Sequence, residues 1–252
     1  TAGNSTIGST SQTVNLPSWR AGAIWQPTNA QSYYVSYSTS FNPSLEQLTS
    51  TTGLSEPLAP EKNKSYEIGG KWDLLNGDLS LNSALFQITQ FNSRSQNADN
   101  TYTANGTIRV NGFRAGAAGR ITDKWQVFGG YTHMNASIID AIAPGTLGMT
   151  PSNTPKDSAS LWTTYDFLPH WQVGGGLTYL SSRYVNNTDL VKVGSYARVD
   201  AMLGYHQPRY DVRLNVFNLA NTNYYDALIQ SDGGRAVPGT GRTVMLSLAY
   251  RM

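Results

Sequence analysis

Apolar and polar side chains alternate along nearly the whole chain. A period of two is typical of a β-strand, because successive side chains point to opposite faces of a sheet. The pattern predicts eleven strands and no helix. The predicted strands cover residues 15–26, 30–40, 62–74, 78–94, 109–120, 125–137, 156–167, 171–182, 195–205, 210–219 and 242–252.

The predicted connections alternate strictly in length. Five are tight turns built from Pro, Asn, Gly and Asp, the residues that favour turn geometry. The five between them are long and cover residues 41–61, 95–108, 138–155, 183–194 and 220–241. Short turns at one end of a sheet and long loops at the other are typical of an outer-membrane β-barrel, whereas a soluble β-sandwich has no reason to sort its loops this way.

The charged residues keep to one face of the predicted strands. In the strand over 210–219, Tyr210, Val212 and Leu214 alternate with Asp211 and Arg213, and several other strands show the same split. This period fits both a soluble sandwich, with its apolar face inside, and a membrane barrel, with its apolar face outside.

Aromatic residues favour the membrane barrel over the sandwich. They gather where the strands meet the tight turns. The clearest examples are Trp25, Trp72, Trp125, Tyr165, Phe167, Trp171, Tyr205, Tyr210 and Tyr250. Aromatic girdles of this kind lie at the interface between a membrane and water.

Composition excludes several classes of protein. Charged residues make up 13% of the chain, about half the usual share, and no apolar run is long enough for a membrane-spanning helix. The lack of cysteine excludes disulfides and thiolate metal sites. A net charge of +2 argues against a nucleic-acid partner, which would require a concentrated basic face.

The number of predicted strands is odd, whereas single-chain bacterial barrels have an even number. Either the count is wrong by one, or the chain is the C-terminal portion of a larger barrel. The second interpretation makes residues 1–14 the remnant of an extracellular loop and residues 15–252 the barrel portion.

Several segments, in order along residues 30–252, resemble TonB-dependent siderophore receptors of the ferric catecholate and hydroxamate type. They are YYVSYSTSF at 33–41, PEKNKSYEIGGKW at 60–72, SLWTTY at 160–165, LNVFNLAN at 214–221 and GTGRTVMLSLAYR at 239–251. The chain departs from the family by ending in Met252 instead of an aromatic residue. Tyr250 keeps the alternating pattern that the barrel assembly machinery reads.

The resemblance implies an all-β fold, a transmembrane antiparallel up-and-down β-barrel of 22 strands, of which this chain supplies about eleven. It implies a receptor and transporter in the bacterial outer membrane, with the plug domain and the first half of the barrel outside this chain. The implied partners are a ferric siderophore, TonB acting through the plug domain, outer-membrane lipid and lipopolysaccharide, and the assembly machinery. Iron enters only as the siderophore complex, so no cofactor is expected.

The sequence predicts neither catalysis nor a resident metal. Its histidines are His133, His170 and His206. A membrane hydrolase would need one of them between a carboxylate or amide and a serine nucleophile, but serine and asparagine are so abundant that such proximity carries no weight. No histidine or carboxylate pair has the spacing of metal ligands.

Once catalysis and metal binding are set aside, ligand binding is the remaining function. Guanidinium and tyrosine suit a bulky, often anionic ferric siderophore through charge, hydrogen bonding and stacking. Candidates on the loop side are Arg94, Tyr102, Arg109, Arg183, Tyr184, Tyr224, Tyr225 and Arg235. Alternatively, the tyrosines at 184, 224 and 225 belong to an outer aromatic girdle, and Arg183 pairs with lipopolysaccharide phosphate or a neighbouring carboxylate.

Two other functions stay open at this point. A self-contained porin of ten or twelve strands would use the charges of the inner face to line a water channel. A soluble β-sandwich adhesin would bury the apolar face instead.

Overall fold

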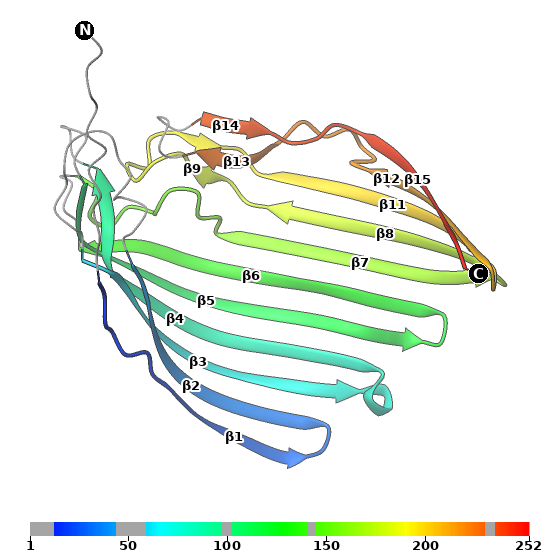
Figure 1. The fold of residues 1–252 in the computed structure, drawn as a ribbon, viewed down its shortest axis with the longest axis horizontal. Helices are drawn as coiled ribbons and strands as arrows, with labels where there is room; N and C mark the ends of the chain where they lie inside the picture. Colours follow the sequence, from blue (N-terminus) through cyan, green and yellow to red (C-terminus); the bar gives the residue numbers. More distant parts are fainter. Residues whose placement is uncertain (1–12, 44–58, 97–101, 141–144, 230–234, 252) are drawn as a thin grey trace, which may run out of the picture.

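A computed structural model describes residues 13–43, 59–96, 102–140, 145–229 and 235–251. Eleven strands form one antiparallel sheet, in which each strand pairs with the next along the chain (Figure 1). These strands are β1 (Arg20–Thr28), β2 (Gln31–Asn42), β3 (Glu61–Leu74), β4 (Leu79–Gln96), β5 (Tyr102–Thr122), β6 (Trp125–Asp140), β7 (Asp157–Leu168), β8 (Trp171–Leu180), β11 (Tyr196–His206), β12 (Tyr210–Phe217) and β15 (Thr243–Tyr250). The predicted number and order of strands are confirmed.

All tight turns lie at one end of the sheet, which we call the turn end, and the long connections lie at the other, the loop end (Figure 1). The turn between β3 and β4 is a single 3₁₀ turn, η2 (Leu75–Gly77), with positive φ angles of 52° at Leu75, 58° at Asn76 and 96° at Gly77. Asparagine and glycine tolerate this conformation best, so Asn76 and Gly77 explain the sharp reversal.

The loop end departs from the prediction. The strand expected to begin at residue 109 begins at Tyr102, because β4 and β5 continue to pair as a two-stranded ribbon as far as Gln96 and Tyr102. The first strand begins at Arg20 instead of residue 15. Two of the predicted long loops contain hairpins, formed by β9 (Arg183–Tyr184) with β10 (Lys192–Val193) and by β13 (Tyr225–Ile229) with β14 (Arg235–Pro238). The four strands of these hairpins are only two to five residues long, too short for an alternation of apolar and polar positions to be recognised, which is why the pattern missed them.

One face of the sheet, the outer face, carries exposed apolar side chains. Ile68, Leu85 and Phe113 lie in one cross-strand row and are 56%, 59% and 37% exposed. Leu246 and Leu248 on β15 are 70% and 72% exposed. Within the described residues no second sheet packs against this face, so the sheet lacks the core that a β-sandwich would require.

The opposite face, the inner face, carries most of the charged residues of the strands; Lys62, Lys64 and Arg109 are exceptions on the outer face. The indole of Trp162 lies here, over two glycines of β8: a Cβ added at Gly174 or Gly176 would come within 3.0 Å or 2.5 Å of its ring. On β4 the large apolar side chains switch faces between Leu85 and Phe86, but the ladder runs through both residues without a register shift, so no bulge causes the switch. No helix of the described chain is long and apolar enough to cross a membrane.

Candidate ligand-binding site at the loop end

Side-chain hydrogen bonds join the connection between β6 and β7 to the β9–β10 hairpin. The Thr150 amide donates to both carboxylate oxygens of Asp189, at 3.1 and 3.2 Å. The Ser152 amide donates to Asn187 Oδ1 at 2.8 Å. Since these bonds satisfy backbone donors that have no strand partner, the two connections form one unit.

Arg183 extends this unit to the β13–β14 hairpin. Its side chain is buried, with the residue 4% exposed. Nη1 donates to Asn153 Oδ1 at 3.0 Å and to the Asp226 carbonyl at 3.2 Å, and Nη2 donates to the Tyr225 carbonyl at 2.8 Å. Asn153 is held in turn, because its amide donates to the Tyr184 carbonyl at 2.9 Å. One guanidinium therefore ties together three connections, which we call the loop cluster.

A second arginine lies beneath the loop cluster on the inner face. Arg198 Nη2 donates to Asp200 Oδ2 at 3.1 Å, and Nη1 donates to the Tyr224 hydroxyl at 3.3 Å. The Tyr224 ring stacks on Tyr196, with 4.4 Å between ring centroids. Gly239 lies against this ring so closely that a Cβ there would come within 2.1 Å of it. The arrangement fixes a cation and two phenols at the mouth of the inner face.

Asn218 shapes the start of the last long connection. It is 1% exposed and has a φ of 52°, which asparagine tolerates better than most residues. Its side-chain amide donates to the carbonyls of Thr222 and Thr240 at 2.9 and 3.1 Å, and its Oδ1 accepts from the Thr222 amide at 2.8 Å. Its own backbone amide donates to Asp200 Oδ1 at 2.8 Å. This network gives the LNVFNLAN motif a physical role that its pattern alone did not reveal.

The structure brings together four of the residues predicted to bind ligand. Arg183, Tyr184, Tyr224 and Tyr225 all lie in or beside the loop cluster, and Tyr225 is 47% exposed. Arg235 begins β14, is exposed, and faces Ile229 across the hairpin.

The other three predicted residues lie on β4 and β5. Arg109 is exposed on the outer face of β5, in register with Thr89 and Ser137. The backbones of Arg94 and Tyr102 belong to the β4–β5 ribbon, and their side chains lie outside the described residues.

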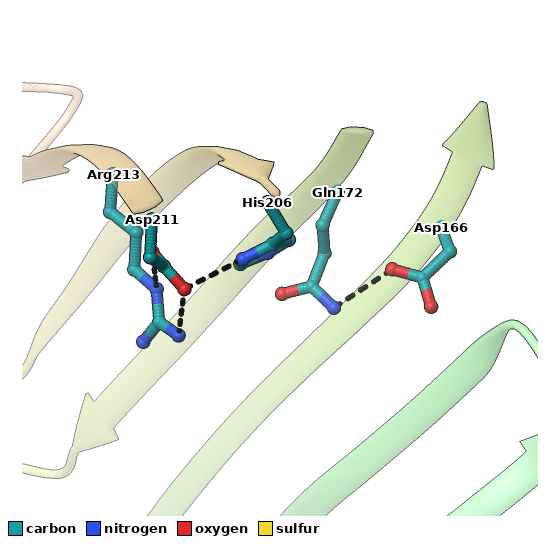
Figure 2. A network of polar contacts seen from close by, with 5 residues as sticks. All are labelled: Asp166, Gln172, His206, Asp211 and Arg213. Atoms are coloured by element: carbon teal, nitrogen blue, oxygen red, sulfur yellow. Dashed lines mark hydrogen bonds and ion pairs between the residues drawn. The ribbon is translucent and has the colours of Figure 1, made fainter. Parts of the chain in front are cut away.

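The inner face near the turn end carries a second polar group of residues (Figure 2). Asp211 accepts from both Nε and Nη2 of Arg213, at 3.0 and 3.2 Å, and lies 2.7 Å from His206 Nδ1. Beside them, Gln172 donates to Asp166 at 2.9 Å. A concave region of about 690 Å³ adjoins Arg213 and Gln172, and its lining also includes Phe128, Trp162, Met202 and Met245. The inner face is thus neither uniformly charged nor uniformly apolar.

Comparison with known proteins decides between the barrel types. The family model described as TonB dependent receptor-like, beta-barrel matches residues 1–219. The chain belongs to this family. Members reside in the outer membrane of Gram-negative bacteria, so the sheet is part of an outer-membrane barrel. Its loop end faces the outside and its turn end faces the periplasm.

Proteins similar to this chain include siderophore receptors. The chain is 32% identical over 250 residues to the probable TonB-dependent siderophore receptor PiuA of Acinetobacter baumannii, covering 92% of this chain and 33% of that protein. It is 34% identical over 252 residues to the catecholate siderophore receptor Fiu of Escherichia coli K12, covering 94% and 33%. The chain therefore spans about one third of the length of these relatives.

Solved structures that resemble this chain are siderophore receptors as well. The crystal structure of PiuA matches with a TM-score of 0.83 at 32% identity, over 92% of this chain and 35% of that one. The closed form of Fiu matches with a TM-score of 0.77 at 32% identity, over 92% and 34%. These relatives are receptors and transporters, not enzymes. The described residues contain no group of three histidines or carboxylates placed to hold a metal ion.

Proposed function

We propose that this chain forms the C-terminal part of the barrel wall of a TonB-dependent receptor that imports ferric siderophores. The observation that carries the proposal is the loop cluster: connections that follow β6, β8 and β12 are tied into one unit by Arg183, directly above the inner face. A pore would be served by loops that leave its mouth open, whereas a receptor needs a preorganised surface that contacts a large ligand from several sides.

The ligand class follows from the side chains at this surface. Tyr184 and Tyr225 offer phenol rings and Arg235 offers a guanidinium, which together can stack on and hydrogen-bond to an anionic catecholate or hydroxamate complex of Fe(III). Iron is cargo in this proposal and no resident cofactor is involved. Arg94 and Tyr102 remain candidates from the neighbouring ribbon.

Two arginines near this surface act by positioning other residues. Arg183 directs both terminal nitrogens into the protein, so it holds the backbone of Tyr225 in place instead of meeting the ligand. Arg198 holds the Tyr224 hydroxyl in the same way. Since Arg109 points away from the inner face, its position favours contact with lipid.

The remaining partners follow from the family. In the complete receptor we propose that a plug domain lies against the inner face and that TonB acts on this plug to open a path for the ligand. The last strand, with Tyr250 on the outer face, would present the alternating pattern that the assembly machinery recognises.

The proposal is tested by equilibrium binding to the complete receptor, purified in detergent and followed by quenching of tryptophan fluorescence. Ferric catecholate and ferric hydroxamate siderophores are titrated separately, with the iron-free siderophores as controls. We expect one ferric complex to bind at submicromolar concentration, and Tyr225→Ala combined with Arg235→Ala to weaken it about tenfold or more, as expected for lost contacts to a charged ligand.

Tyr165→Phe on the outer face is the matched control, because it changes a phenol far from the loop cluster. Saturable binding of no ferric siderophore by a correctly folded receptor would refute the proposal. Equal loss of affinity in the control and in the loop variant would show that the loop residues do not form the site.

A further inference from the structure

The outer face of β3, β4 and β5 changes its chemistry toward the extracellular end. Three successive cross-strand rows show the change. From the middle of the sheet outward they are Ile68, Leu85 and Phe113; then Tyr66, Gln87 and Asn111; then Lys64, Thr89 and Arg109. An apolar row is followed by a row of phenol and amides, and then by a row with two cations, one on either side of a threonine.

A third cation extends this group. Lys62 lies two residues beyond Lys64 on the same face of β3, and it pairs across the strands with Phe91. The Lys64 ammonium lies 5.2 Å from the centroid of the Phe91 ring. Because neighbouring strands are about 4.8 Å apart, Lys64 and Arg109 are separated by roughly 10 Å at the backbone. The three residues are called the cation cluster below.

The height of the cation cluster can be worked out from the strands. Trp72 marks the periplasmic edge of the apolar band on β3, and Lys62 lies ten residues further along. At about 3.3 Å per residue and a strand tilt near 40°, this is roughly 25 Å of height, which equals the usual height of the apolar band of a barrel. The same calculation along β5, starting from Thr122 beside Trp125, places Arg109 several ångströms further toward the outside than Lys62. The cluster therefore spans the level of the lipid head groups in the outer leaflet.

None of the three cations has an acidic partner among the described residues, and all three are exposed. Other arginines of the sheet behave differently: Arg114 pairs with Glu67 at 2.7 Å, and Arg213 with Asp211 at 3.0 Å. Both of those pairs lie on the inner face. The three cations of the outer-face cluster thus differ from these inner-face arginines, because no carboxylate of the described residues pairs with them.

We propose that Lys62, Lys64 and Arg109 form a binding site for the phosphate groups of an anionic lipid in the outer leaflet. The positive charge of the cation cluster and its level in the membrane both match a phosphorylated lipid head group. The apolar and tyrosine rows beneath the cluster would contact the acyl chains of the same lipid. Tyr37 and Tyr66 contribute here, with ring centroids 5.1 Å apart. A soluble anion would meet the cations alone, whereas a lipid meets both surfaces at once.

The test uses the complete receptor in dodecyl maltoside and native mass spectrometry. It is titrated with diphosphoryl lipid A, with monophosphoryl lipid A and with inorganic phosphate. Each basic residue near a charged membrane surface contributes about 1 kcal/mol, so we expect roughly fivefold weaker binding of diphosphoryl lipid A for Arg109→Gln and about 30-fold for Lys62→Gln/Lys64→Gln. Monophosphoryl lipid A should bind more weakly than the diphosphoryl form.

The matched control is Lys124→Gln/Arg209→Gln, which removes two exposed cations at the turn end. Heat-modifiable migration on gels confirms that every variant is folded. Unchanged affinity in the Lys62→Gln/Lys64→Gln receptor, or an equal loss in the control, overturns the proposal. Displacement of the lipid by equimolar inorganic phosphate would show a site for free anions and overturns it as well. The result does not depend on the siderophore. Failure of the lipid proposal can therefore be distinguished from failure of the proposed transport function.

Discussion

Replacing Arg183 by alanine should loosen the loop cluster without weakening the barrel. The guanidinium donates three hydrogen bonds, to Asn153 Oδ1 and to the carbonyls of Tyr225 and Asp226, and none of these acceptors belongs to the eleven-stranded ladder. The perturbation should therefore be local.

The size of the effect follows from burial. A hydrogen bond to a charged group contributes about 1.5–3 kcal/mol, but part of that is regained when water reaches the freed carbonyls. We take roughly 3 kcal/mol as the net loss of local stability for three such bonds around a residue that is 4% exposed. This corresponds to an equilibrium constant for opening of the β13–β14 hairpin that is about 150-fold larger.

Amide hydrogen exchange on the complete receptor measures this directly. Peptides covering 149–155 and 225–229 should lose protection in Arg183→Ala, while peptides from β5 and β6 should exchange as in the wild type. Arg183→Lys should rescue little, because a single ammonium cannot replace two donor nitrogens aimed at separate acceptors. Lys192→Ala, an exposed cation of the neighbouring β10, is the control. Unchanged protection of the 225–229 peptide in Arg183→Ala would show that Arg183 does not hold the loop cluster together.

Three further predictions address other parts of the structure. Asn218→Ala should destabilise the connection after β12 by roughly 3 kcal/mol, because it removes three side-chain hydrogen bonds and places alanine at a φ of 52°; exchange of the amides near Thr222 reports it. Gly176→Ala should cost about 1–3 kcal/mol in urea unfolding, because its Cβ would collide with Trp162, and the additional change Trp162→Leu should recover most of the loss. Leu246→Arg on the outer face should cost about 2–4 kcal/mol of stability in lipid vesicles, whereas Ser247→Arg on the inner face should cost clearly less; equal costs would contradict the assignment of the two faces.

The strands could be predicted from sequence because lipid on one side and a polar interior on the other impose a strict period of two. Tyr210, Val212 and Leu214 alternate with Asp211 and Arg213 for that reason. The turn end was predictable as well, since its turns carry their own chemistry in Asn76 and Gly77. At the loop end, by contrast, the alternation along β5 is weak, because Ala104 and Gly106 occupy the positions between Tyr102 and Ile108, so the length of the β4–β5 ribbon could not be predicted.

The site was only partly predictable because it depends on contacts between residues far apart in sequence. Residue type alone marked Arg183 as a ligand contact, but its acceptors come from Asn153 and Asp226, 30 and 43 residues away. No local pattern indicates such burial. Asn218 was part of a recognisable motif, yet its φ and its bond to Thr240 become visible only in the folded chain.

Cellular uptake tests the central claim most directly. The complete receptor is expressed in a strain that lacks its own siderophore receptors, and uptake of ⁵⁵Fe-labelled siderophore is measured with and without functional TonB. We predict uptake that saturates at submicromolar siderophore and disappears without TonB. Uptake that persists without TonB and never saturates, with the protein correctly placed in the outer membrane, would show an open pore and contradict the account.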